Sequence, residues 1–74
     1  MQKTISSNQL KALQTKALEI LGNNAQIYGV SLEDLARQDG FKDIHDLIHW
    51  EVTKLVFGSE LSHSCSLVIK DVKQ

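Results

Sequence analysis

The sequence contains no proline, one cysteine and no long run of apolar residues. Because Cys65 is the only cysteine, no disulfide can form within the chain, which is typical of a reducing compartment. No apolar stretch approaches the roughly 20 residues that a membrane-spanning helix needs, and we expect no signal peptide at the start of the chain. We therefore expect a cytoplasmic protein without a membrane partner.

The residues that are present suit one small domain. The chain has 74 residues, 42% of them hydrophobic, so we expect a single domain over 1–74 with a marginal core. We expect residues 1–5 to be frayed or weakly extended and residues 73–74 to be frayed. A chain this short often gains stability by self-association, which predicts a homo-oligomer.

Charge is distributed unevenly along the chain. Residues 1–30 carry a net charge of +2, residues 31–57 carry −3, and the remainder is neutral. The central segment is therefore acidic, and it could pack on the mildly basic first helix or meet a basic partner.

Hydrophobic periodicity predicts a mainly α-helical domain with three helices, at about 7–21, 32–39 and 43–57. The first helix follows a cluster of capping residues, and Gly22 with two following asparagines predicts its end. Its apolar stripe comprises Leu10, Leu13, Ala17, Ile20 and Leu21.

The second and third helices are expected to form a helix–turn–helix-like hairpin. Ser31 and Asp43 are suitable N-caps for these two helices, and Gly40 and Gly58 are suitable residues to end them. On the third helix, one broad apolar face is formed by Ile44, Ile48, Val52 and Leu55.

Two segments outside the helices have some strand character. Residues 25–30 are compatible with a short strand or an ordered loop, and residues 65–72 have the composition of a minor C-terminal β-strand. Because a lone strand cannot satisfy its backbone, the second segment must pair with the first, with a symmetry mate or with a partner's sheet, or else stay disordered.

The third helix also carries the predicted protein interface. Glu51 projects into its apolar face, either as a carboxylate that reaches water at the edge of the core or as a buried acid paired across an interface. Trp50 and Phe57 project on another side, next to Leu47 and Lys54. This side is either covered by the rest of the domain or available to a partner, since aromatic residues often dominate binding energy.

A metal site is a weaker hypothesis. His45 and His49 are four residues apart on one helix, a spacing that can hold zinc, and His63 and Cys65 could complete a tetrad. The alternative interpretation, exposed histidines beside the core, is the one we adopt, and we expect no cofactor.

The hairpin shape also allows a nucleic-acid-binding hypothesis. The second helix of a DNA-binding helix–turn–helix presents basic or amide side chains to the bases. Here the early positions of that helix are Asp43, His45, Asp46 and His49, and phosphates would repel the two aspartates. The sequence therefore disfavours nucleic acid as a partner.

The run LARQDGF at residues 35–41, followed by an apolar helix with Trp50, resembles the closing segment of ASCH domains over residues 29–72. ASCH domains are PUA-related β-barrels proposed to bind RNA, and some act as amidohydrolases. The resemblance implies a helix that ends at Gly58 and a final strand at 67–72. The family's Gly-x-Lys-x-x-Glu-x-Arg signature is missing, so the resemblance assigns no functional residue.

These observations favour a non-enzymatic protein–protein interaction module. Compact chains of this kind are common among small regulatory or accessory proteins of phages and mobile elements, and we expect a protein of that type. A nucleic-acid-binding regulator and a small metal-binding domain are the alternatives.

Overall fold

The computed structural model of the protein describes residues 2–62 and 64–70. Within these ranges the chain forms three α-helices, a short 3-10 helix and a two-stranded sheet, which confirms the mainly α-helical prediction. In chain order the elements are β1 (Gln2–Ile5), α1 (Ser7–Tyr28), α2 (Leu32–Gln38), α3 (Ile44–Phe57), η1 (Gly58–Glu60) and β2 (Ser66–Ile69).

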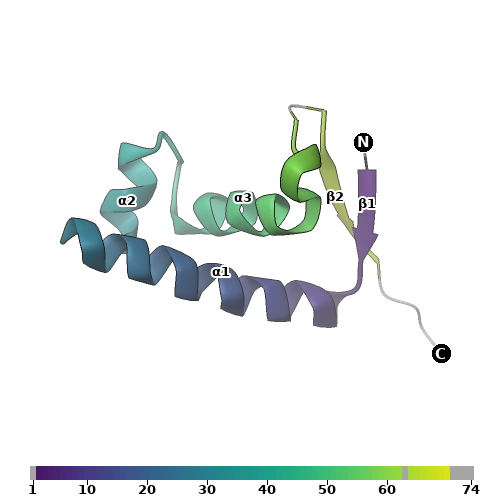
Figure 1. The fold of residues 1–74 in the computed structure, drawn as a ribbon, viewed down its shortest axis with the longest axis horizontal. Coiled ribbons are helices and arrows are strands. Elements are labelled where there is room, and N and C mark those ends of the chain that lie inside the picture. Colours follow the sequence, from purple (N-terminus) through teal and green to yellow (C-terminus); the bar gives the residue numbers. More distant parts are fainter. Residues whose placement is uncertain (1, 63, 71–74) are drawn as a thin grey trace.

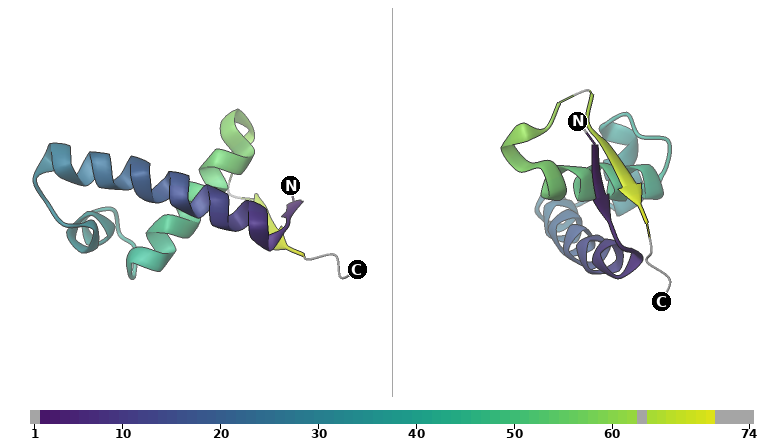
Figure 2. Two further views of the ribbon diagram at one scale, coloured as in Figure 1. Left: turned by 90° about the horizontal axis from the view of Figure 1, so that it is seen from below. Right: turned by 90° about the vertical axis from the view of Figure 1, so that its right-hand side faces the viewer.

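The long helix α1 supports the other elements (Figure 1). The hairpin of α2 and α3 packs along it, with α2 near its C-terminal end and the sheet beside its N-terminal end. The views in Figure 2 show that α3 crosses α1 obliquely. No helix in the described ranges is both long enough and apolar enough to cross a membrane.

Side-chain caps define where the helices begin. Ser6 accepts a hydrogen bond from the N–H of Gln9, and the Gln9 side chain accepts one from the N–H of Ser6, so the two form a capping box at α1. The predicted caps Ser31 and Asp43 are confirmed at α2 and α3. Each cap satisfies an amide that has no helical partner and contributes about 1 kcal/mol.

The prediction that Gly22 ends the first helix is wrong. Helix α1 continues to Tyr28, because Ala25 is buried in the same cluster as Leu21 one turn earlier. That packing outweighs the roughly 1 kcal/mol by which glycine disfavours a helix interior. The helix ends at Gly29, which has a φ of 69°. Residues 25–28 are therefore helical, and no strand forms in this part of the chain.

The predicted ends of the other two helices are confirmed. The last helical residue of α2 is Gln38, and Gly40 follows with a φ of 83°. Helix α3 ends at Phe57, and Gly58 has a φ of 55°. Glycine fits both positions because side chains disfavour positive φ.

The hydrophobic core cluster lies where the C-terminal half of α1 meets α2 and α3. Half-buried side chains, including Phe41 and Ile48, pack around it. Small residues at several contact positions allow the helices to approach closely. The cluster comprises Leu21, Ala25, Leu35, Ala36 and Leu47.

The two strands pair in parallel, with Gln2 opposite Ser66 and Ile5 opposite Ile69. Residues Gln2–Ile5 are therefore extended and not frayed, which agrees with the second of the two alternatives expected for residues 1–5. The C-terminal strand is observed at Ser66–Ile69, and it pairs with the N-terminal segment rather than with residues 25–30. Parallel strands need a long crossover, which the helices provide. Residues 71–74, including the predicted frayed end at 73–74, lie outside the described residues.

Candidate functional site

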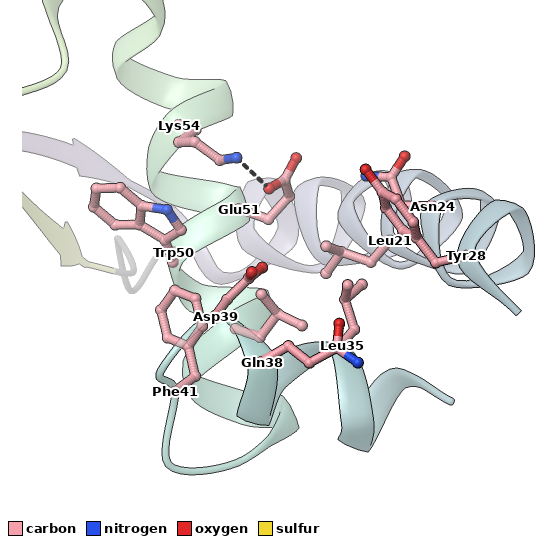
Figure 3. A pocket seen from close by; sticks show the side chains of 11 residues that line it. Leu21, Asn24, Tyr28, Leu35, Gln38, Asp39, Phe41, Trp50, Glu51 and Lys54 are labelled. Atoms are coloured by element: carbon pink, nitrogen blue, oxygen red, sulfur yellow. Dashed lines mark ion pairs between the residues drawn. The ribbon is translucent and has the colours of Figure 1, made fainter. Parts of the chain in front are cut away.

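An open groove of about 700 Å³ lies between the C-terminal half of α1, the end of α2 and one side of α3 (Figure 3). Leu21, Leu35 and Leu47 give it apolar surface that belongs to the core. The residues around them come from three helices and the turn after α2. The groove is therefore a product of the tertiary fold and not of a single sequence motif.

Three of the four aromatic side chains in the chain line this groove. Tyr28 is 70% exposed and Trp50 is 39% exposed, while Phe41 is half-buried against the core. In Figure 3, Trp50 and Phe41 lie toward one side of the groove and Tyr28 toward the opposite side. Accessible aromatic surface beside buried leucines is typical of sites that bind another molecule.

Glu51 is buried and paired within its own helix. Its Oε2 lies 2.8 Å from the Lys54 ammonium, three residues further along α3. The Glu51 side chain is 11% exposed and that of Lys54 is 44% exposed, so the lysine carries its charge outward while the carboxylate stays in the groove wall. The observed partner of this buried acid is therefore Lys54 of the same helix.

Asp39 places a second carboxylate in the groove. It is the exposed C-cap residue of α2, and its backbone N–H donates to carbonyls of that helix. Its carboxylate has no ion pair or hydrogen bond among the described residues. Since Lys54 already pairs with Glu51, the charged groups of the groove leave one uncompensated negative charge.

Four of the five predicted interface residues meet in this groove. Leu47 is 2% exposed and lies in the apolar wall, Trp50 is accessible, and Glu51 and Lys54 form the ion pair. Helical spacing placed Leu47, Trp50 and Lys54 on one side of the helix in the sequence analysis, whereas Glu51 was assigned to the apolar face.

Phe57 does not belong to this surface. It is 3% exposed, and the Lys3 ammonium lies 5.3 Å from the centre of its ring. Lys3 also donates to the carbonyl oxygen of Val56 and lies 3.8 Å from a carboxylate oxygen of Glu60. The N-terminal strand thus covers the side of α3 that carries Phe57. We expected Trp50 and Phe57 to share one side of this helix, because the sequence analysis did not foresee β1.

Several groove residues were not predicted. The sequence analysis did not place Tyr28, Asp39 or Phe41 at a binding surface, and it expected Asp39 at the end of the helix at 32–39 and Phe41 just after Gly40. Their contribution depends on where α1 ends and how α2 packs against α3, and neither follows from local sequence. One signal was available in the sequence: the chain has only four aromatic residues, so few positions could form an aromatic site.

The candidate metal ligands do not come together in the described part of the chain. His45 and His49 are exposed on α3, and Cys65 is half-buried before β2, where its Sγ lies 3.2 Å from the backbone nitrogen of Ser62. No group of three or more possible ligands is found among the described residues. His63 lies outside them.

A second, smaller hollow of about 370 Å³ lies at the turn between α2 and α3. Its charged lining is mixed, because it contains Arg37 and Lys42 together with Glu33 and Asp43. Arg37 is already paired with Asp34 at 3.0 Å. This hollow therefore offers no continuous positive surface for phosphates.

Comparison of the chain with family models, curated proteins and solved structures finds no match. The resemblance to ASCH domains consequently stays a prediction from residues 29–72.

Proposed function

We propose that this chain is a non-enzymatic protein-interaction module, and that the groove between Tyr28 and Trp50 holds a helical segment of another protein. The observation that carries the proposal is that three of the four aromatic side chains line one groove with buried leucines beside them.

The shape of the groove favours a segment of protein as its occupant. It is open and bounded by helices, which suits an amphipathic helix that inserts one or two apolar side chains. Such an anchor would contact Leu21 and Leu47 and displace water from the accessible faces of Tyr28 and Trp50. Binding energy at protein interfaces is concentrated in buried aromatic anchors of this kind.

The chemistry of the lining also favours binding over catalysis. The groove residues include no serine, threonine, cysteine or histidine, and these residue types supply most nucleophiles and general bases. The most buried carboxylate, Glu51, is held by Lys54 in the chain itself. We therefore retain the interaction function over an enzymatic one.

Self-association is a further part of the proposal. The core is small, and Leu18 and Ile69 are each 42% exposed outside the groove. A short chain with accessible apolar surface gains stability from a second copy. The molecular mass in solution, measured across a range of concentrations, tests this part separately from binding of a different protein.

The groove is tested by comparing Trp50→Ala with a matched control. Ile27→Ala removes an exposed apolar side chain that does not line the groove. In pull-downs from the native host, a specific partner should bind the wild type and the control variant and be lost with Trp50→Ala. The proposal is wrong if Trp50→Ala remains folded by circular dichroism and captures the same partners as the wild type.

A further inference from the structure

We propose that the groove selects an arginine side chain of its protein partner, which stacks on Trp50 and pairs with Asp39. This inference rests on the proposed interaction function and adds the chemistry by which the partner is recognised.

The first argument is the charge of the groove. Glu51 and Lys54 neutralise each other at 2.8 Å, whereas the carboxylate of Asp39 has no ionic partner among the described residues. A ligand with a positive charge would complete this arrangement, whereas a ligand carboxylate or phosphate would add a second unpaired negative charge.

The second argument is the direction of the surrounding helices. Helix α1 ends at Tyr28 and α2 ends at Gln38, and both residues line the groove. The C-terminus of a helix carries a partial negative charge of about half an elementary charge. The last turn of α1 contains no basic residue to offset it, and Arg37 in the last turn of α2 is paired with Asp34. The partial charges at these two helix ends therefore have the same sign as the charge of the Asp39 carboxylate.

The third argument is the aromatic lining, which distinguishes arginine from lysine. Trp50 has the ring that attracts a cation most strongly, and Phe41 and Tyr28 lie in the same groove. A guanidinium group is planar, so it can stack on the indole and still donate two parallel hydrogen bonds to the Asp39 carboxylate. An ammonium group has no plane to stack.

A second copy of the chain is a poorer source of this arginine. Arg37 is the only arginine in the sequence, and it is held by Asp34 on the same helix that forms one side of the groove. We therefore assign the arginine to a different protein.

The test uses acetyl-Leu-Arg-amide as the probe and acetyl-Leu-citrulline-amide as its neutral isostere. Trp50 is the only tryptophan, so its indole N–H resonance in a proton–nitrogen NMR spectrum reports on the groove directly. We expect the arginine probe to shift this resonance and to bind about fivefold or more tightly than the citrulline probe at low salt. The Asp39→Asn variant should remove that difference, and Ile27→Ala should retain it.

Equal affinity for the two probes, or an unchanged preference in Asp39→Asn, overturns arginine recognition. If Trp50→Ala still abolishes partner capture in that case, the interaction function stands and only this inference fails. Capture that is unaffected by Trp50→Ala removes the interaction function itself. A dimer that is lost with both Trp50→Ala and Arg37→Gln, measured by sedimentation, would show that a second copy supplies the arginine and would overturn the assignment to another protein.

Discussion

The Lys54 ammonium lies 2.8 Å from Glu51 Oε2, yet the two side chains differ greatly in solvent exposure. Glu51 is 11% exposed and Lys54 is 44% exposed. The carboxylate is therefore the member that depends on the pair, because the ammonium can be solvated without it. This difference in exposure predicts that removing Lys54 and removing Glu51 will change the stability of the protein by different amounts.

Replacing Lys54 with methionine should destabilise the protein more than replacing Glu51 with glutamine. Lys54→Met keeps the aliphatic stem and leaves a largely buried carboxylate unpaired, at a cost of about 1–2 kcal/mol. Glu51→Gln leaves an ammonium that can turn to water, at a cost below about 1 kcal/mol. Urea unfolding of the two variants measures the difference. The double variant serves as the control and should recover part of the Lys54→Met loss, and equal losses in both single variants would contradict the argument.

Phe57 and Trp50 should have opposite roles in stability and binding. Phe57→Ala removes a buried ring and should cost about 3–5 kcal/mol, which is much of the roughly 5–15 kcal/mol that stabilises a typical domain. Trp50→Ala acts on a side chain that is 39% exposed and should lower stability far less while weakening partner binding. Thermal unfolding followed by circular dichroism separates the two effects.

The milder variant Phe57→Leu provides the control, since it retains apolar volume at the same position. It should remain folded and bind the partner as the wild type does. Loss of binding in a folded Phe57→Leu variant would show that Phe57 belongs to the interface despite its burial.

The elements that were predicted correctly have strong local signals. Ser31 and Asp43 cap α2 and α3 through hydrogen bonds to residues three positions later, and Gly58 ends α3. These contacts are made within one turn of helix, so sequence spacing is enough to identify them. The same spacing placed Trp50 and Lys54 on one side of α3, and both line the groove.

The elements that were missed depend on distant contacts. Strand β1 has only four residues, and its partner β2 lies at the opposite end of the chain. The burial of Phe57 follows from that pairing, because β1 brings Lys3 over its ring. Likewise, the groove could not be predicted from α3 alone. Tyr28 lines it because α1 continues beyond Gly22 as far as Tyr28.

Two glycine-to-alanine substitutions should change stability in opposite directions. Gly22 is helical, and a Cβ atom there would meet no other atom within 4 Å, so Gly22→Ala should stabilise the protein by about 0.5–1 kcal/mol. Gly29 has a φ of 69°, so Gly29→Ala should destabilise it by about 1 kcal/mol. Chemical unfolding under identical conditions checks both signs. A destabilising Gly22→Ala would indicate that the first helix ends where the sequence analysis placed its end.

Proline substitutions in β2 should reveal which side of the strand is paired. The N–H of Lys70 donates to the carbonyl oxygen of Ile5 at 2.9 Å. Because successive amides in a strand point to opposite sides, the N–H of Val68 also turns toward β1, and that of Ile69 turns away. Val68→Pro should therefore cost about 1 kcal/mol more than Ile69→Pro, the value of one lost ladder hydrogen bond.

Threonine at the same two positions separates the amide from the side chain, because threonine keeps the N–H and favours strands. The proline-minus-threonine difference in unfolding free energy should be larger at Val68 than at Ile69. A reversed order would require the opposite edge of β2 to be hydrogen-bonded to β1. That result would be incompatible with the register that sets Ile5 against Ile69, and with the placement of Lys3 over Phe57 that depends on it.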